Sequence, residues 1–158
     1  MEVFTTNGFR TVDTNGTFVE AGNGDYIAKN SEVFKKGNAV AIDADGFLVR
    51  ATGVVRAFGI ALEDFTATSD NQTVAKTGPR IQLVVPHVQY YAKANADLVQ
   101  ADLGDHFNIA TASDVQTVDK TTGAEATAAE QVVRIVKLDP FKKGADGVRD
   151  CIVTFVTR

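Results

Sequence analysis

The residues of this chain that could do chemistry are few, and the most suggestive is an acidic turn. Asp43-Ala44-Asp45-Gly46 begins like a calcium-binding loop, in which carboxylates at alternate positions supply oxygen ligands. Such a loop lies between two helices. It also needs an oxygen ligand two residues after Asp45 and a glutamate at its twelfth position. Phe47 and Val54 stand there instead, and alternating apolar residues flank the turn. The pattern therefore predicts a hairpin turn and no metal site.

The other candidate groups do not form a catalytic motif. His87 and His106 each stand at the end of a strand-like run, outside any serine or cysteine nucleophile motif. The carboxylate pair Glu63-Asp64 could in principle serve glycoside hydrolysis, but acids beside turns are usually solvated. Cys151 alternates within an apolar strand with no neighbouring base, which predicts a small buried residue. Because phosphate-binding glycine motifs are also missing, we expect no catalytic residues, no cofactor and no enzyme activity.

Composition excludes several classes of partner. The chain has 158 residues, a length typical of one domain, and sixteen basic residues are scattered among twenty acidic ones for a net charge of −4. Without a positive stripe, nucleic acid is not an expected partner. The longest apolar runs are far shorter than the roughly 20 residues that span a bilayer, so no membrane partner is expected. The single cysteine forbids an intrachain disulfide, which fits a reducing compartment.

The hydrophobic pattern predicts an all-β fold, a small β-barrel with at most one short helix. Valine, isoleucine, threonine and phenylalanine come in short alternating runs, punctuated by thirteen glycines. A helical turn is expected between Ala94 and Gly104, where the apolar spacing changes. The predicted strands span residues 17–21, 25–29, 38–43, 47–51, 55–63, 80–88, 106–110, 131–138 and 150–157.

Turn residues and composition predict three local features of the fold. Residues 38–51 form a hairpin around the Asp-Ala-Asp-Gly turn, and the last two strands form another around Asp146-Gly147. Gly59 inside a strand pattern indicates a bulge or a close backbone approach. Residues 111–131, rich in threonine, alanine and acids, are expected to form a long surface loop or a hairpin with a mobile tip.

These elements together have a family resemblance. The segments "KKGNAVAIDADGFLVRATG" and "AFGIALEDF" resemble the bacteriophage capsid decoration, or cement, proteins, in which a glycine turn, a short hairpin and a "GIAL"-type strand recur. "QADLGDHFNIAT", "VRIVKLDP" and the closing "IVTFVT" are similar to phage virion proteins of that kind. The resemblance extends over residues 35–158 and is one of pattern, without a catalytic motif.

The resemblance implies a structural virion protein with a β-barrel or β-tulip domain at residues 35–158. Such a protein binds the major capsid protein on the outside of an icosahedral head, often as a homotrimer, and stabilises the shell. Its location would be the exterior of the virion capsid, after assembly in the host cytoplasm. The alternatives are a phage tail or fibre component, or a small carbohydrate-binding β domain, for which only Tyr90-Tyr91 offers suitable aromatics.

The resemblance does not explain residues 1–34. Phenylalanines alternate there with Asn-Gly and Gly-Asn-Gly turns at intervals too short for long strands. The segment is either the first hairpins of the barrel or an arm that orders on a neighbouring subunit. On the arm interpretation, the residues at the interface with the capsid or another subunit are Phe4, Phe9, Phe18 and Tyr26.

Overall fold

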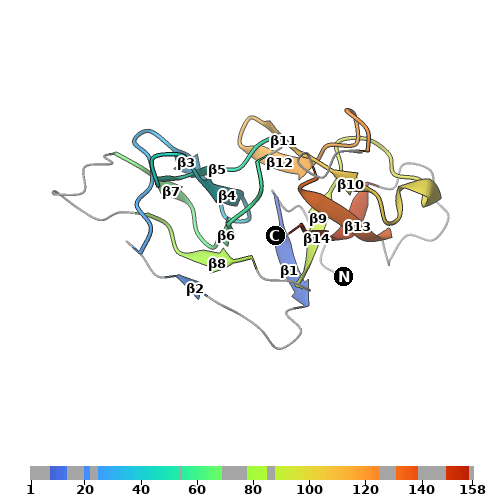
Figure 1. The fold of residues 1–158 in the computed structure, drawn as a ribbon, viewed down its shortest axis with the longest axis horizontal. Helices are drawn as coiled ribbons and strands as arrows, with labels where there is room; N and C mark the ends of the chain where they lie inside the picture. The colour runs from blue at the N-terminus through green and yellow to red at the C-terminus, as the bar shows by residue number, and fades with distance from the viewer. Residues whose placement is uncertain are drawn as a thin grey trace.

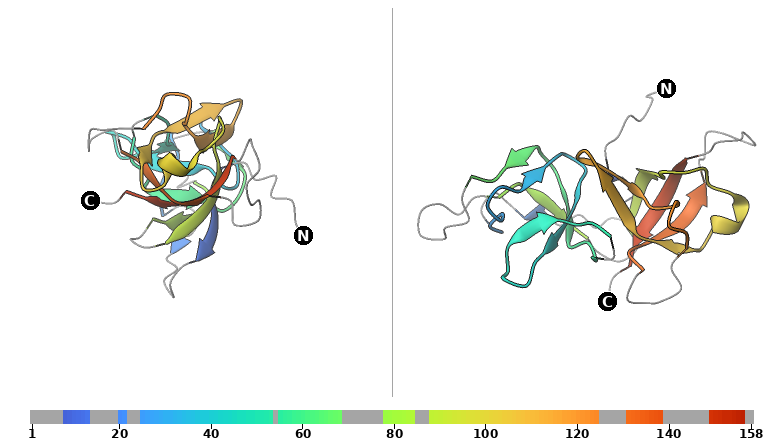
Figure 2. Two further views of the ribbon diagram at one scale, coloured as in Figure 1. Left: turned by 90° about the vertical axis from the view of Figure 1, so that its right-hand side faces the viewer. Right: turned by 90° about the horizontal axis from the view of Figure 1, so that it is seen from above.

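The protein is all-β, as its sequence pattern predicts. The computed structural model describes residues 8–13, 20–21, 25–53, 55–68, 78–84, 88–124, 131–138 and 149–156. These residues form short strands and one turn of 3-10 helix, η1 (Gln100–Asp102), within the range expected to be helical. Their strands are arranged in two lobes that lie side by side (Figure 1; Figure 2, right).

Lobe 1 consists of a five-stranded antiparallel sheet and a two-stranded one. The two-stranded sheet pairs β3 (Val33–Phe34) with β7 (Phe65–Thr66). The order of the larger sheet is β2-β8-β6-β4-β5, with these bounds: β2 Glu20–Ala21, β8 Ile81–Leu83, β6 Gly59–Ala61, β4 Ala39–Ile42 and β5 Leu48–Arg50.

Lobe 2 has the same plan. Its small sheet is the hairpin of β11 (Ile109–Ala112) and β12 (Val115–Val118). The order of its five-stranded sheet is β1-β9-β14-β13-β10, with these bounds: β1 Arg10–Asp13, β9 Gln89–Lys93, β14 Asp150–Phe155, β13 Val133–Leu138 and β10 His106–Phe107. Within the described residues neither five-stranded sheet closes on itself, so the expected barrel is replaced by two open sheets.

The chain passes from lobe 2 to lobe 1 and back. Strand β1 pairs with β9 in lobe 2, whereas β2 and β3 pair with β8 and β7 in lobe 1. Lobe 1 is thus inserted between β1 and β9. The expected boundary after residue 34 does not coincide with either lobe, because the described strands of residues 1–34 belong to both. The division of the chain into two lobes arises from strand pairing between residues far apart in the sequence. No change in local composition indicates where one lobe ends and the other begins.

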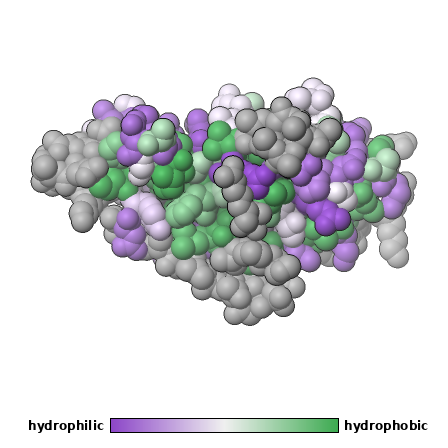
Figure 3. Space-filling view, in the orientation of Figure 1, coloured by the Kyte–Doolittle hydropathy of each residue, from purple (hydrophilic) through white to green (hydrophobic). Residues whose placement is uncertain are grey.

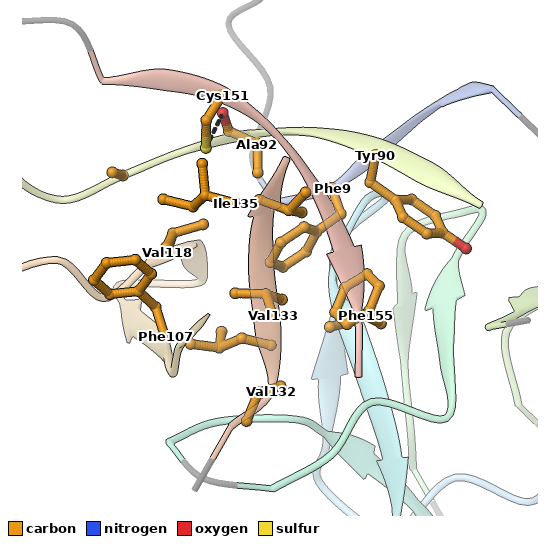
Figure 4. Close-up of a cluster of buried hydrophobic side chains, with 14 of the residues drawn as sticks. Phe9, Tyr90, Ala92, Phe107, Val118, Val132, Val133, Ile135, Cys151 and Phe155 are labelled. Carbon is orange, nitrogen blue, oxygen red and sulfur yellow. Dashed lines mark hydrogen bonds between the residues drawn. The ribbon is translucent and has the colours of Figure 1, made fainter. Parts of the chain in front are cut away.

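Side-chain alternation along β4 connects the two lobes. Val40 packs into the small core of lobe 1, while its neighbours Ala39 and Ala41 point the other way into the core of lobe 2. Ala51 and Ile60 join them on that face. Figure 4 shows the lobe 2 side of this larger core, with Phe9, Tyr90 and Phe155 at one end and Phe107 and Val118 at the other. The main apolar core is therefore shared between the lobes.

The structure confirms the best-defined local predictions. The β4-β5 and β13-β14 hairpins both form, although the Asp146-Gly147 turn lies outside the described residues. A Cβ atom on Gly59 would lie 2.7 Å from the carbonyl oxygen of Gln82, so this glycine allows the predicted close backbone approach. Residues 25–29 do not form the expected strand, and only Ala28 makes a single bridge, to Leu48.

Candidate functional site

Phe9, one of the four predicted interface residues, belongs to the chain's own core. Its side chain is 2% exposed and meets the ring of Phe155 edge-on, with 4.9 Å between centroids. Its backbone N–H donates to the carbonyl of Gly37 at 2.7 Å, which joins lobe 2 to lobe 1. In this chain the Phe9 side chain is thus enclosed by its own core, and its contact with another subunit stays a prediction.

Tyr26 lies in lobe 1, apart from Phe9. It is half-buried and packs edge-on against Phe58, with ring centroids 4.9 Å apart, at the margin of the lobe 1 core. Gly78 approaches its backbone so closely that a Cβ atom would overlap the Tyr26 carbonyl oxygen. The structure therefore does not bring Phe9 and Tyr26 together as one surface. Phe4 and Phe18 lie outside the described residues.

The acidic turn at Asp43 is closed by its own side chain. The Asp43 carboxylate accepts hydrogen bonds from the backbone N–H groups of Asp45 and Phe47 at 3.0 and 2.9 Å. Lys29 donates its Nζ to the other oxygen at 2.8 Å. The Lys29 hydrogen bond, followed by the backbone bond from Phe47, lowers the pKa of Asp43. These contacts occupy the oxygens that a calcium site would use, and the predicted hairpin turn is confirmed.

A buried glutamine in lobe 2 pairs with the backbone of lobe 1. Gln116, on β12, is 1% exposed, and its Oε1 accepts from the N–H of Ala39 at 2.6 Å. Its Nε2 donates to the carbonyls of Ala39 and Ala51, at 3.2 and 2.6 Å. The carboxamide therefore pairs with β4 and the end of β5 in the way a neighbouring strand would. We call Gln116 with Ala39 and Ala51 the interlobe clamp.

The tip of the β11-β12 hairpin is held by lobe 1 next to the interlobe clamp. Ser113 and Asp114 form its two-residue turn with φ angles of 48° and 67°, in the left-handed region that favours glycine or asparagine. Arg50 forms an ion pair with the Asp114 carboxylate, and the Asn38 side chain donates to the Asp114 carbonyl. These contacts from lobe 1 hold a turn that its own residues do not favour.

Sequence reasoning missed the interlobe clamp, because residues 111–131 were expected to form a surface loop or a hairpin with a mobile tip. The hairpin alternative is confirmed for residues 109–118. One signal was present in "VQTV", where Gln116 and Val118 share the buried side of a strand pattern. A polar residue at a buried position needs partners, and here they come from a sheet far away in the sequence.

The titratable groups with shifted pKa values each have a structural cause. Burial, and secondarily the charge of Asp150, raises the pKa of the Cys151 thiol to about 12, and its Sγ lies 3.6 Å from the Ala92 carbonyl oxygen (Figure 4). Burial raises the pKa of Tyr90 to about 12. The pKa of His106 is lowered, mainly by burial and then by Arg134. The predicted burial of Cys151 is confirmed.

The Asp119 loop after β12 is held by hydrogen bonds within lobe 2. Burial alone would raise the pKa of Asp119, but hydrogen bonds from Thr122 and Asn95 outweigh it and lower the pKa. Nearby, the buried Asp102 carboxylate forms an ion pair with Lys120 at 2.5 Å. These groups have protein partners that account for their positions. Nothing in their geometry requires a ligand.

Across the part of the chain that the structure describes, no three His, Cys, Asp or Glu side chains gather in a way that could hold a metal ion. No described helix is long and apolar enough to cross a membrane. On the face seen in Figure 3, apolar patches alternate with hydrophilic ones over both lobes. No protein-family model matches this chain, and no curated protein matches it either.

Proposed function

We propose that this chain is a structural virion protein that binds the outer surface of a phage head and stabilises the shell. Support comes from the resemblance, whose segments form β4, β5 and β6 of lobe 1. In lobe 2 they form β10 and β13 and parts of β11 and β14. The resembling residues thus contribute central strands of both lobes. On this proposal the partner is the major capsid protein.

The observation that carries the proposal is the way the lobes are joined. A protein that ties neighbouring shell subunits together has to transmit force from one contact to the other without bending. The two lobes share an apolar core, and the interlobe clamp adds three buried hydrogen bonds between them. Such a junction resists hinge motion, because opening it would expose apolar surface and leave buried polar groups unpaired. An elongated rigid body of this kind suits a bridging role.

The carbohydrate-binding alternative loses its candidate residues. Sugar rings stack on exposed aromatic faces, but Tyr90 is fully buried and Tyr91 is 6% exposed. A tail or fibre component remains the second candidate within the virion class. The two differ in copy number, since a decoration protein covers the shell whereas a tail component is present in a few copies.

The direct test is quantitative mass spectrometry of purified particles, with the major capsid protein as internal standard. We expect a near-stoichiometric ratio between this chain and that protein, and shells stripped of the chain should rupture at a lower temperature. A few copies per particle would favour the tail component. Absence from particles would overturn the proposal.

Self-association is part of the proposal. Both five-stranded sheets present edge strands, which proteins commonly cover by pairing with another chain, and three linked contacts at a threefold position add avidity. We expect light scattering to report about three times the chain mass of 16.9 kDa. A monomer both in solution and on the shell would contradict this part.

A further inference from the structure

A row of buried residues crosses the five-stranded sheet of lobe 1 on the side that faces lobe 2. In the strand register, Ile60 on β6 lies between Gln82 on β8 and Ala39 on β4. The neighbour of Gln82, Ile81, packs in the lobe 1 core, so alternation along β8 turns Gln82 toward lobe 2. The row therefore has a buried carboxamide at each end, that of Gln116 in the interlobe clamp and that of Gln82.

The polar groups at the two ends of this row are satisfied to different degrees. In the interlobe clamp, both polar atoms of the Gln116 carboxamide are hydrogen-bonded. At the other end Gln82 is 2% exposed, and its Oε1 accepts from the hydroxyl of Thr11 on β1 at 2.5 Å. The Nε2 atom of Gln82 is enclosed and has no hydrogen-bond partner among the described residues. A buried donor in this state costs free energy unless something accepts from it.

A second enclosed polar group lies beside Thr11. Tyr90 on β9 is directly opposite Thr11 in the antiparallel pairing with β1, so the two side chains stand on the same face of the lobe 2 sheet. The Tyr90 ring packs edge-on against Phe155, and its hydroxyl has no partner in the described part of the chain. Figure 4 shows this hydroxyl pointing away from the Phe107 end of the core. Because Thr11 bonds to Gln82, the register brings both unpartnered groups to the same part of the lobe junction.

The chemistry of these groups defines what they can bind. Gln82 offers the N–H donors of Nε2, and burial raises the pKa of Tyr90 to about 12, so the tyrosine hydroxyl stays protonated and can donate. Thr11 donates its own hydrogen to Gln82 and keeps lone pairs that can accept. The surrounding core is apolar, so an ion would be bound without a counter-charge. A fitting ligand is small, uncharged and able both to accept and to donate, and we call Thr11, Gln82 and Tyr90 the junction site.

We propose that the junction site binds one buried water molecule, which accepts from Gln82 Nε2 and the Tyr90 hydroxyl and donates to Thr11. Buried waters typically make about three hydrogen bonds to polar groups that lack other partners, which is the number available here. The water links both lobes, since Gln82 belongs to lobe 1 and the other two residues to lobe 2. It gives the junction a second polar connection, at the opposite end of the apolar row from the interlobe clamp. This connection depends on the chain's own fold and not on the partner assigned under the proposed function.

The first test is a double-mutant cycle of Tyr90→Phe and Gln82→Met, measured by thermal unfolding. We expect Tyr90→Phe to lower the Tm by about 3 °C, because it removes one partner of the water. In the Gln82→Met background the same substitution should change the Tm by less than about 1 °C, since the water has already lost its amide donor. The matched control is Tyr26→Phe, at a half-buried tyrosine of lobe 1, which should shift the Tm by no more than about 1 °C.

Two outcomes of the cycle overturn the inference. An unchanged or raised Tm for Tyr90→Phe would show that its hydroxyl has no partner to lose. The full loss of Tm persisting in the Gln82→Met background would show that the two side chains do not share a ligand. If Gln82→Met does not fold, Thr11→Val takes its place in the cycle, because it removes the group to which the water donates.

A second measurement distinguishes a bound water from a direct hydrogen bond between the two side chains. The Gln82 carboxamide could turn so that its Oε1 accepts from Tyr90, and this would also couple the two substitutions. In the isotope-labelled wild-type chain we expect the Gln82 side-chain amide protons to show a dipolar cross-peak with a long-lived water in NMR spectra. Coupling in the cycle without that cross-peak overturns the inference in favour of the direct hydrogen bond.

Discussion

The two hairpins at the lobe junction, β4-β5 and β11-β12, are built in opposite ways. The β4-β5 turn carries Gly46 at a φ of 86°, and the Asp43 side chain satisfies the backbone N–H groups inside the turn. The β11-β12 turn has Ser113 and Asp114 at positive φ, and it is held by Asn38 and Arg50 of the other lobe. One hairpin is specified by its own residues, and the other by tertiary contacts.

The difference explains which hairpin a sequence pattern can predict. A local hairpin shows its turn residues in the sequence, because the side chain and the glycine that close it are a few positions apart. A hairpin held from a distance can tolerate unfavourable turn residues, because contacts elsewhere offset their cost. The comparison can be tested by substitutions that remove either kind of support.

The largest expected effect is that of Gln116→Leu, which removes the interlobe clamp. The N–H and carbonyl of Ala39 and the carbonyl of Ala51 would lose their Gln116 hydrogen bonds inside the junction. The Ala39 carbonyl keeps the Ala51 N–H as its donor, so the groups that lose their partner are the Ala39 N–H and the Ala51 carbonyl. Since each unpaired buried group costs about 1–3 kcal/mol, we expect a loss of about 2 kcal/mol or more in the free energy of unfolding, measured by urea denaturation.

The control for Gln116→Leu is Val115→Ala, an exposed position on the same strand, for which we expect a change within about 0.5 kcal/mol. If Gln116→Leu prevents folding, Gln116→Asn keeps an uncharged carboxamide on a shorter side chain and should retain a measurable transition. Equal urea midpoints for Gln116→Leu and Val115→Ala would show that the interlobe clamp does not stabilise the fold.

Asp43→Ala should have the next largest effect, because it removes the carboxylate that accepts hydrogen bonds from the backbone N–H groups inside the β4-β5 turn. Asp43→Asn keeps an acceptor oxygen for the backbone N–H groups but loses the charge attracted to Lys29. We therefore expect the urea midpoint to fall in the order wild type, Asp43→Asn, Asp43→Ala. An Asn variant as unstable as the Ala variant would mean that the ion pair, and not the turn geometry, stabilises this hairpin.

The same carboxylate predicts a pH dependence. The pKa of Asp43 is lower in the folded protein than its ordinary value of 3.8, so folding favours the charged form. Its contribution is fully present above the unfolded pKa and is lost as the pH falls through the folded pKa. The gap in urea midpoint between wild type and Asp43→Asn should therefore be constant above about pH 4 and shrink steadily as the pH falls below it, and a gap that does not shrink with falling pH would contradict the prediction.

Arg50→Met tests the ion pair that holds the tip of the β11-β12 hairpin. The Arg50 and Asp114 side chains are 25% and 44% exposed, so water screens their attraction. We expect a loss of about 0.5–1 kcal/mol that shrinks in high salt, measured by urea denaturation with and without added NaCl. An effect independent of salt would point to packing of the arginine stem instead.

The last test is a reciprocal pair of turn substitutions, of which Ser113→Gly has the smallest expected effect. Ser113→Gly relieves a non-glycine residue at positive φ and should stabilise the protein by about 0.5 kcal/mol, less the added freedom of the unfolded chain. Gly46→Ser places a side chain at a φ of 86° and should destabilise it by about 1 kcal/mol. Thermal unfolding of both variants checks the opposite signs, and two shifts of the same sign would contradict the comparison.

Several features followed from the sequence by local physics alone. Short alternating runs with glycine punctuation predicted the all-β class, and the acids and glycine of residues 43–46 predicted their turn. The burial of Cys151 and the close approach at Gly59 also depend on a few neighbouring positions. These predictions held because strand periodicity and turn chemistry act over two to four residues.

Only the tertiary structure decided the rest. The insertion of lobe 1 between β1 and β9, the burial of Phe9 and the pairing of Gln116 with Ala39 join residues far apart in the chain. A phenylalanine between two turns has the same local pattern whether it anchors an arm or fills a core. Which of these occurs depends on whether another strand lies within reach, and that is determined by long-range pairing, which no local pattern records.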